Sequence, residues 1–249
     1  MLTVKEKIYS GAVCEQLVYN VSERIGSCKK AELRPRFKNA AEREKYNLEK
    51  SRRNFVRTVN ATFGPSAYWC TMTCSAENEI HDFETAKREL NNFVRRMRRS
   101  VPDVQIVAVM GRGKSTHRVH FHAIIAGASE ETIREKWNLG NVDRIDHLRE
   151  KTTYNGKTLW HDYTALANYM FDHWTPEQGK KRWTATKNLV KPEREAPTLV
   201  KRTYTEAKPP KPPKGYVFVE AKATTYGFLY YKYVKEPESE KRGRKPRIT

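Results

Sequence analysis

The sequence predicts an α+β fold in which helices pack against a central antiparallel sheet. The expected elements follow one another in the order β, α, β, β, α, β, α, which is typical of such sandwiches. Two apolar runs, 104–110 and 119–126, are joined by a short glycine-containing loop and are therefore expected to form an antiparallel hairpin. The 249 residues are enough to bury a core, which favours one main domain with an extension at each end.

The first part of the chain, residues 1–53, is highly charged, and we expect it to form a basic helical extension. A helix is expected over 38–57, because apolar residues recur there with weak helical spacing among Lys, Arg and Glu. Gly64 and Pro65 predict a turn soon after this helix. The main domain is expected to span residues 54–198.

Within the main domain, residues 68–74 have the composition of a strand. A helix is expected over 82–99, since Asp82 suits an N-cap and apolar side chains then recur at helical spacing. Pro102 ends that helix before the two hairpin strands, whose connecting loop covers 111–117.

The second half of the domain is expected to contain two more helices and one more strand. Ser129 suits the N-cap of a short helix that ends near Trp137, and 140–145 reads as a turn followed by a strand. The last helix is expected over 162–174, with Pro176 beyond its end.

The C-terminal part, residues 199–249, combines a linker, a hairpin and a tail. The proline-rich stretch 209–213 predicts a stiff linker. Strands are expected over 215–219 and 226–233, and the basic tail 241–247 is expected to be disordered.

The charge of the chain predicts a polyanionic partner. The 48 Lys and Arg residues exceed the 29 Asp and Glu residues and give a formal net charge of +19. Such a surface repels itself unless it meets opposite charge, so nucleic acid is the leading candidate partner. General solubility is the alternative explanation.

The sequence favours a cytoplasmic protein that does not contact a membrane. No apolar run approaches the ~20 residues that a spanning helix needs, and the first residues do not resemble a signal peptide. None of the four cysteines belongs to a Cys-x-x-Cys pair, so neither a disulfide framework nor a zinc finger is indicated. Reduced thiols are expected.

The most informative residues are His120 and His122. Alternate side chains of a strand share a face, so these two imidazoles are expected to point together, opposite Val119 and Phe121. Paired neutral imidazoles make half of a divalent metal site. His117, at the junction of loop and strand, is the nearest candidate for a third ligand. The alternative is a polar strand face with incidental histidines.

A candidate nucleophile lies on the helix over 162–174. Tyr169, Asp172 and His173 are spaced i, i+3 and i+4, so they share a face away from the apolar stripe of that helix. A phenol attacks poorly unless its proton is removed, and a nearby histidine and metal ion can do this. The alternative is an aromatic side chain that only packs on the flank of the helix.

Two basic segments are candidates for DNA contacts. Gly113-Lys114-Ser115 resembles the end of a phosphate-binding loop, but Ala108 stands where that motif needs glycine and the segment leads into a strand. We therefore expect a basic hairpin loop that touches the DNA backbone, with no ATP hydrolysis. Basic residues interleaved with an aromatic ring suit single-stranded nucleic acid, although a solvated basic face is the alternative. The residues expected to bind DNA are Arg112, Lys114, Lys180, Lys181, Arg182, Trp183 and Lys187.

Four segments together resemble the HUH endonucleases, specifically the rolling-circle replication initiators, or Rep proteins, of phages, plasmids and integrated mobile elements. In family order these segments are a first strand at 68–73, the His-hydrophobic-His motif at 118–122, the tyrosine helix at 167–170 and a downstream segment at 181–192. The resemblance covers roughly residues 50–195.

The resemblance implies a five-stranded antiparallel sheet, Mg²⁺ or Mn²⁺ held by His120 and His122, and attack of Tyr169 on a DNA phosphate. The products would be a 5′-phosphotyrosine link and a free 3′-hydroxyl. Many members carry an acidic third ligand where this chain has Met110-Gly111, which leaves His117 as the substitute. Many also carry a lysine where this chain has Asp172, which makes His173 the candidate assisting group.

The implied partners are single-stranded or hairpin origin DNA, a host helicase and a host polymerase, with the protein a monomer or weak oligomer. Three other functions stay open at this point. A conjugative relaxase (mobilisation protein) and a related transposase use the same chemistry, and a non-catalytic single-stranded nucleic-acid binding protein would present the same basic and aromatic surface.

Overall fold

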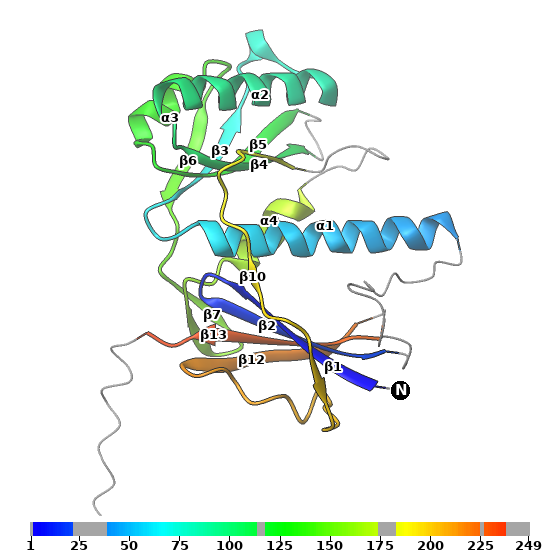
Figure 1. Cartoon of the computed structure of the whole chain (residues 1–249). Coiled ribbons are helices and arrows are strands. Elements are labelled where there is room, and N and C mark those ends of the chain that lie inside the picture. Colours follow the sequence, from blue (N-terminus) through cyan, green and yellow to red (C-terminus); the bar gives the residue numbers. More distant parts are fainter. Residues whose placement is uncertain (1, 22–38, 114–117, 174–182, 225–226, 238–249) are drawn as a thin grey trace, which may run out of the picture. The chain divides into compact units, whose positions relative to one another are not determined.

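The computed structural model describes residues 2–21, 39–113, 118–173, 183–224 and 227–237 (Figure 1). The chain divides into two compact units. The central unit comprises Lys50–Glu150 and Tyr163–Lys191, and the terminal unit comprises Met1–Glu49, Lys151–Asp162 and Pro192–Thr249. This division differs from the expected succession of extension, domain and tail, since the terminal unit is assembled from three separate segments.

A five-stranded antiparallel sheet forms the middle of the central unit, with strand order β6-β3-β5-β4-β9. The predicted α+β class with an antiparallel sheet is therefore confirmed. The strands are β3 (Tyr68–Thr73), β4 (Gln105–Arg112), β5 (Val119–Ala126), β6 (Val142–His147) and β9 (Thr184–Ala185). In the sheet His122 lies opposite Thr71 on one side and Val109 on the other, so these three side chains share a face.

Two helices, α2 (Phe83–Ser100) and α3 (Glu130–Lys136), cover the other face of this sheet (Figure 1). The helical spacing of Leu90, Phe93 and Met97 places all three on one side of α2, where they are fully buried. Phe121 of β5 points into this core, where its ring meets Trp137 edge-on at 5.1 Å. Because Phe121 faces the core, the flanking histidines must face away from it. A short 3₁₀ turn, η2 (Ala76–Asn78), precedes α2.

The histidine face of the sheet is approached by α4 (Thr164–Asp172) and by α1 (Ala40–Thr62), whose second half belongs to the central unit (Figure 1). Phe55 of α1 is fully buried, and its ring lies 5.8 Å from that of Phe171 in α4. The amide oxygen of Asn60 accepts a hydrogen bond from the N–H of Tyr163 at 2.8 Å. These contacts fix the start and the orientation of the tyrosine helix.

The terminal unit is built on a six-stranded sheet with the order β10-β1-β2-β13-β12, in which β11 also pairs with β1. A separate hairpin of β7 and β8 belongs to the same unit. The strands are β1 (Leu2–Ser10), β2 (Val13–Val21), β7 (Lys151–Tyr154), β8 (Lys157–Trp160), β10 (Glu193–Arg194), β11 (Thr198–Val200), β12 (Tyr216–Ala223) and β13 (Leu229–Lys235).

The expectation of a wholly helical N-terminal extension is wrong. Residues 2–21 form the antiparallel hairpin of β1 and β2, which turns at Gly11 with a φ of 58°. The strands bury Val4, Ile8 and Val13 while their charged residues lie between these apolar positions.

Two other expectations at the ends of the chain agree with the structure. The expected helix over 38–57 corresponds to α1, and the expected C-terminal hairpin corresponds to β12 and β13. The basic tail at 241–247 lies outside the described residues, so its expected disorder stays a prediction.

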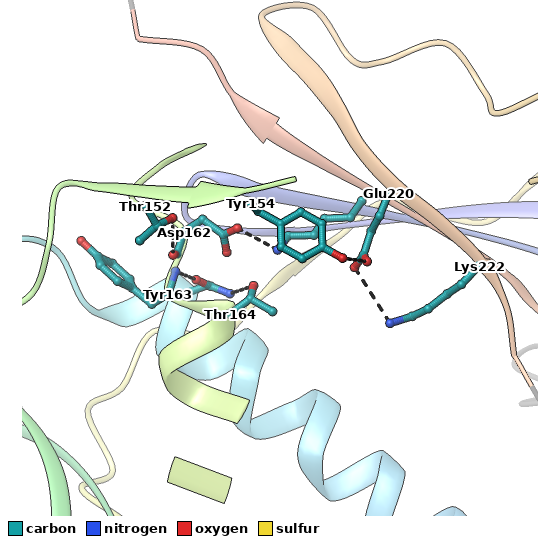
Figure 2. Close-up of polar contacts among 9 residues, drawn as sticks. Thr152, Tyr154, Asp162, Tyr163, Thr164, Glu220 and Lys222 are labelled. Carbon is teal, nitrogen blue, oxygen red and sulfur yellow. Dashed lines mark hydrogen bonds and ion pairs between the residues drawn. The ribbon is translucent and has the colours of Figure 1, made fainter. Parts of the chain in front are cut away.

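A buried ion pair holds the chain just before α4. The ammonium of Lys232 on β13 lies 2.7 Å from a carboxylate oxygen of Asp162, and the two side chains are only 6% and 4% exposed. Figure 2 shows this pair beside Thr152, whose hydroxyl donates to the Asp162 carbonyl at 3.4 Å. Among the described residues, no helix is both long and apolar enough to cross a bilayer.

Candidate functional site

His120 and His122 project from the same face of β5, with ring centres 5.0 Å apart. Nδ1 of His122 lies 3.3 Å from the hydroxyl of Thr71 on the neighbouring strand, and this contact orients the ring. His122 is only 4% exposed, and its buried Nε2 has no hydrogen-bond partner in the part of the chain that the structure describes. A buried nitrogen without a partner is costly unless something binds it.

The electrostatics keep both imidazoles neutral. Burial lowers the pKa of His122 to about 3, with smaller contributions from the neighbouring His120 and His173. Burial also lowers the pKa of His120, against a hydrogen bond with the backbone of Arg118 that raises it. A neutral imidazole keeps a lone pair, and this is the form that binds metal ions.

His173, at the end of α4, joins the pair. Its ring centre lies 4.8 Å from that of His122 and 6.1 Å from that of His120. Its Nδ1 lies 2.8 Å from the carbonyl oxygen of Tyr169. Because a carbonyl only accepts hydrogen bonds, Nδ1 carries the proton, and the Nε2 lone pair is left for another partner.

These residues fit a divalent cation. Three imidazoles that bind one ion at about 2.1 Å have ring centres about 4.5 to 5.2 Å apart, and two of the three separations here fall in that range. Across the described ranges, no group of three or more His, Cys, Asp or Glu side chains already forms a complete metal site. Mg²⁺ and Mn²⁺ prefer oxygen ligands, so water or phosphate oxygens would fill the other positions.

Tyr169 lies on the same side of the sheet as the imidazoles. Its ring centre is 4.2 Å from that of His173 and 5.9 Å from that of His122. The side chain is 46% exposed, so its hydroxyl is accessible to a large substrate. A phenol, a histidine with a free lone pair and two further imidazoles therefore converge at one open position.

Trp69 and Arg144 belong to this site although the sequence analysis assigned them no role. Trp69 on β3 meets the Tyr169 ring edge-on at 5.9 Å, and the Arg144 guanidinium lies 4.4 Å over the Trp69 ring. Asp146 pairs with Arg144. Trp69, Thr71 and His122 share a face through the register of β3 and β5. Alternation along 68–74 gives the signal for Trp69, whereas Arg144 is found only once β6 is known to pair with β3.

The remaining expected site residues divide into three groups. Arg112 at the end of β4 and Lys187 are exposed. Trp183 packs edge-on against buried Phe55, with ring centres 5.5 Å apart, so its ring is at least partly structural. The others lie outside the described residues, namely Lys114, His117, Lys180, Lys181 and Arg182. Asp172 does not approach the imidazoles but forms an ion pair with Arg52 of α1 at 2.6 Å.

Gly111 leaves the space that His120 occupies. A Cβ at this position would lie 2.6 Å from Nε2 of His120 and 2.8 Å from the carbonyl oxygen of His173. We expect Gly111→Ala to lower the affinity for Mn²⁺ about tenfold, because it displaces the imidazole from its place beside His122. Isothermal titration calorimetry with Mn²⁺ measures this loss.

Gly64→Ala is the matched control, since a Cβ there meets nothing within 4 Å. It should bind Mn²⁺ as the native protein does. Equal Mn²⁺ affinity in the Gly111→Ala protein would show that His120 is not a ligand in this geometry.

Residues 67–178 match a family model that describes replication-associated proteins of the ORF2 type. The matched stretch contains β3, the two histidines of β5 and the tyrosine helix. No curated protein and no solved structure was found to match the chain. The match supports an involvement in replication initiation.

Proposed function

We propose that this protein initiates rolling-circle replication by nicking and rejoining single-stranded DNA, in the manner of an HUH endonuclease. The observation that carries the proposal is the exposed Tyr169 phenol beside His173, on the face that presents His120 and His122. The similarity to replication-associated proteins agrees with this function. The net charge of +19 suits a polyanionic substrate.

The reaction is a transesterification. Oη of Tyr169 attacks the scissile phosphorus, the bond from phosphorus to the 3′ oxygen breaks, and the 5′ phosphate stays on the tyrosine. The phenolic proton passes to Nε2 of His173, whose Nδ1–H is held by the Tyr169 carbonyl, and then to the departing 3′ oxygen. The phosphodiester energy is kept in the phosphotyrosine, so a later 3′-hydroxyl can reverse the step without ATP.

His120 and His122 would hold Mg²⁺ or Mn²⁺ in this site. When bound there, the ion supplies positive charge that polarises the phosphate and offsets the charge of the transition state. The two imidazoles are neutral and rigidly placed on β5, which lowers the cost of assembling the site. Thr71 keeps the His122 ring in one orientation through its hydroxyl.

Trp69 and Arg144 would hold the nucleotide next to the scissile phosphate. The indole offers a face for base stacking, and the exposed guanidinium offers donors for a neighbouring phosphate. Their position beside Tyr169 would align the strand for in-line attack. An unpaired strand is the expected substrate because its bases are free to stack.

The decisive experiment is covalent capture of DNA. Native protein mixed with single-stranded origin oligonucleotide and Mn²⁺ should give an adduct that survives denaturing electrophoresis. We expect a chelator, or His122→Ala, to lower the adduct yield about 100-fold or more, because charge stabilisation by a metal contributes several kcal/mol.

His81→Ala removes an exposed histidine outside the site and serves as the matched control for this experiment. It should form the adduct as the native protein does. DNA binding without any adduct, under all metal conditions, would instead identify a non-catalytic single-stranded DNA binding protein.

A further inference from the structure

The terminal unit has a pocket of its own. It encloses about 600 Å³ and is lined by β8 together with parts of β12 and β13. Its apolar lining includes the half-buried rings of Trp160 and Phe218, and its charged lining consists of Lys157, Lys235 and Glu236. This combination of aromatic surface and cations is unlike the imidazole site of the central unit.

Lysine side chains lie over both aromatic rings of the pocket. Nζ of Lys151 is 4.1 Å from the centre of the Trp160 ring, and Nζ of Lys157 is 5.5 Å from that of Phe218. Both lysines are exposed. An exposed cation–π contact is worth about 0.5–1 kcal/mol, whereas stacking of a nucleobase on an aromatic ring is worth about 1–3 kcal/mol. A base can therefore displace an ammonium, which is then free to bind the adjacent phosphate.

The charge of the unit selects the kind of ligand. The three segments of the terminal unit carry 26 Lys and Arg residues against 15 Asp and Glu residues. Within the pocket lining, Glu236 is outnumbered by Lys157 and Lys235, and Lys151 adds a further cation at Trp160. An anionic ligand with flat apolar rings complements this surface in both charge and shape.

We infer that this pocket binds an unpaired nucleobase of single-stranded DNA, with its neighbouring phosphates on the lysines. The base stacks on Trp160 or Phe218, and the phosphates replace these rings as partners of Lys151 and Lys157. The choice of DNA as the polyanion rests on the proposed function, but the site adds a contact that the nicking chemistry does not require. The terminal unit thus serves as a second anchor for the substrate strand.

Photocrosslinking tests this site directly. The full chain is irradiated with an oligothymidine strand that contains 5-bromodeoxyuridine, and the crosslinked peptides are identified by mass spectrometry. We expect peptides that contain Trp160 or Phe218. In fluorescence anisotropy with oligothymidine, Trp160→Ala should weaken binding about tenfold, whereas Trp160→Phe should retain most of the affinity because it keeps a stacking surface.

Tyr154→Ala is the matched control, since Tyr154 is an exposed aromatic residue on the same hairpin that does not line the pocket. It should bind oligothymidine as the native protein does. Lys157→Glu should weaken binding more than the same change at Lys208, an exposed lysine of this unit outside the pocket. Melting temperatures report whether each variant is folded.

Three outcomes would overturn the inference: crosslinks confined to central-unit peptides, unchanged affinity in folded Trp160→Ala, or equal competition by polyglutamate and oligothymidine. The last outcome would indicate a surface for acidic protein segments. Crosslinking needs no nicking, so it succeeds or fails independently of Tyr169. A chain that crosslinks through Trp160 but never forms the covalent adduct would keep this inference and reject the proposed function.

Discussion

Tyr169→Phe is expected to abolish the covalent DNA adduct while leaving DNA binding intact. The change removes only the phenolic oxygen, and the ring keeps its edge-on contact with Trp69 and its place beside His173. Because no other atom of the side chain can bond to phosphorus, adduct yield and strand cleavage should fall by about 10⁴-fold or more. Denaturing electrophoresis of labelled oligonucleotide measures the adduct, and anisotropy measures binding.

Tyr163→Phe is the matched control for this prediction. Tyr163 lies six residues earlier, but its ring is only 2% exposed, and burial raises the pKa of its phenol to about 12. Its buried hydroxyl has no hydrogen-bond partner among the described side chains, so the loss of that oxygen should cost little stability. An adduct that persists in Tyr169→Phe and disappears in Tyr163→Phe would assign the nucleophile to Tyr163.

The residues of the candidate site that sequence alone brings together are those with a local spacing. The period of a strand places His120 and His122 on one face, and the period of a helix places Tyr169 and His173 on one side. Neither rule says which side of the sheet the helix approaches. That depends on packing between distant residues, such as Phe55 with Phe171 in the structure.

The neighbours of the nucleophile show the same limit. Arg144 reaches Trp69 because β6 pairs with β3, and the two strands lie far apart in the chain. No spacing rule in a single sequence gives a pairing between distant strands. The edge of the candidate site was therefore missed although its centre was predicted.

Some structural features had local signals that the sequence analysis did not use. Asn155 and Gly156 form the turn between β7 and β8, both with positive φ, and Asn-Gly is the strongest short hairpin signal. The hairpin of β1 and β2 likewise turns at Gly11. The composition of the terminal unit is different, because β13 from the C-terminal end pairs with β2 from the N-terminal end, and only tertiary structure reveals this.

Lys232→Met is expected to lower the free energy of unfolding by about 3–5 kcal/mol, the usual cost of breaking a buried ion pair by removing one partner. Lys232 and Asp162 are both almost fully buried and lie 2.7 Å apart, so methionine would leave the carboxylate in an apolar setting without its cation. Urea denaturation followed by circular dichroism measures the change in stability. Asp162 directly precedes Tyr163, so the pair also fixes the chain at the entrance to α4.

Two further variants separate charge from packing. Lys222→Met removes a lysine that is 59% exposed and lies 3.9 Å from Glu220, as Figure 2 shows, and it should change stability by no more than about 1 kcal/mol. The double variant Asp162→Asn, Lys232→Met removes both buried charges and should recover much of the lost stability. If Lys232→Met costs no more than Lys222→Met, the pair contributes nothing beyond an exposed contact, and the fixed position of the chain before α4 must come from the hydrogen bond between Tyr163 and Asn60.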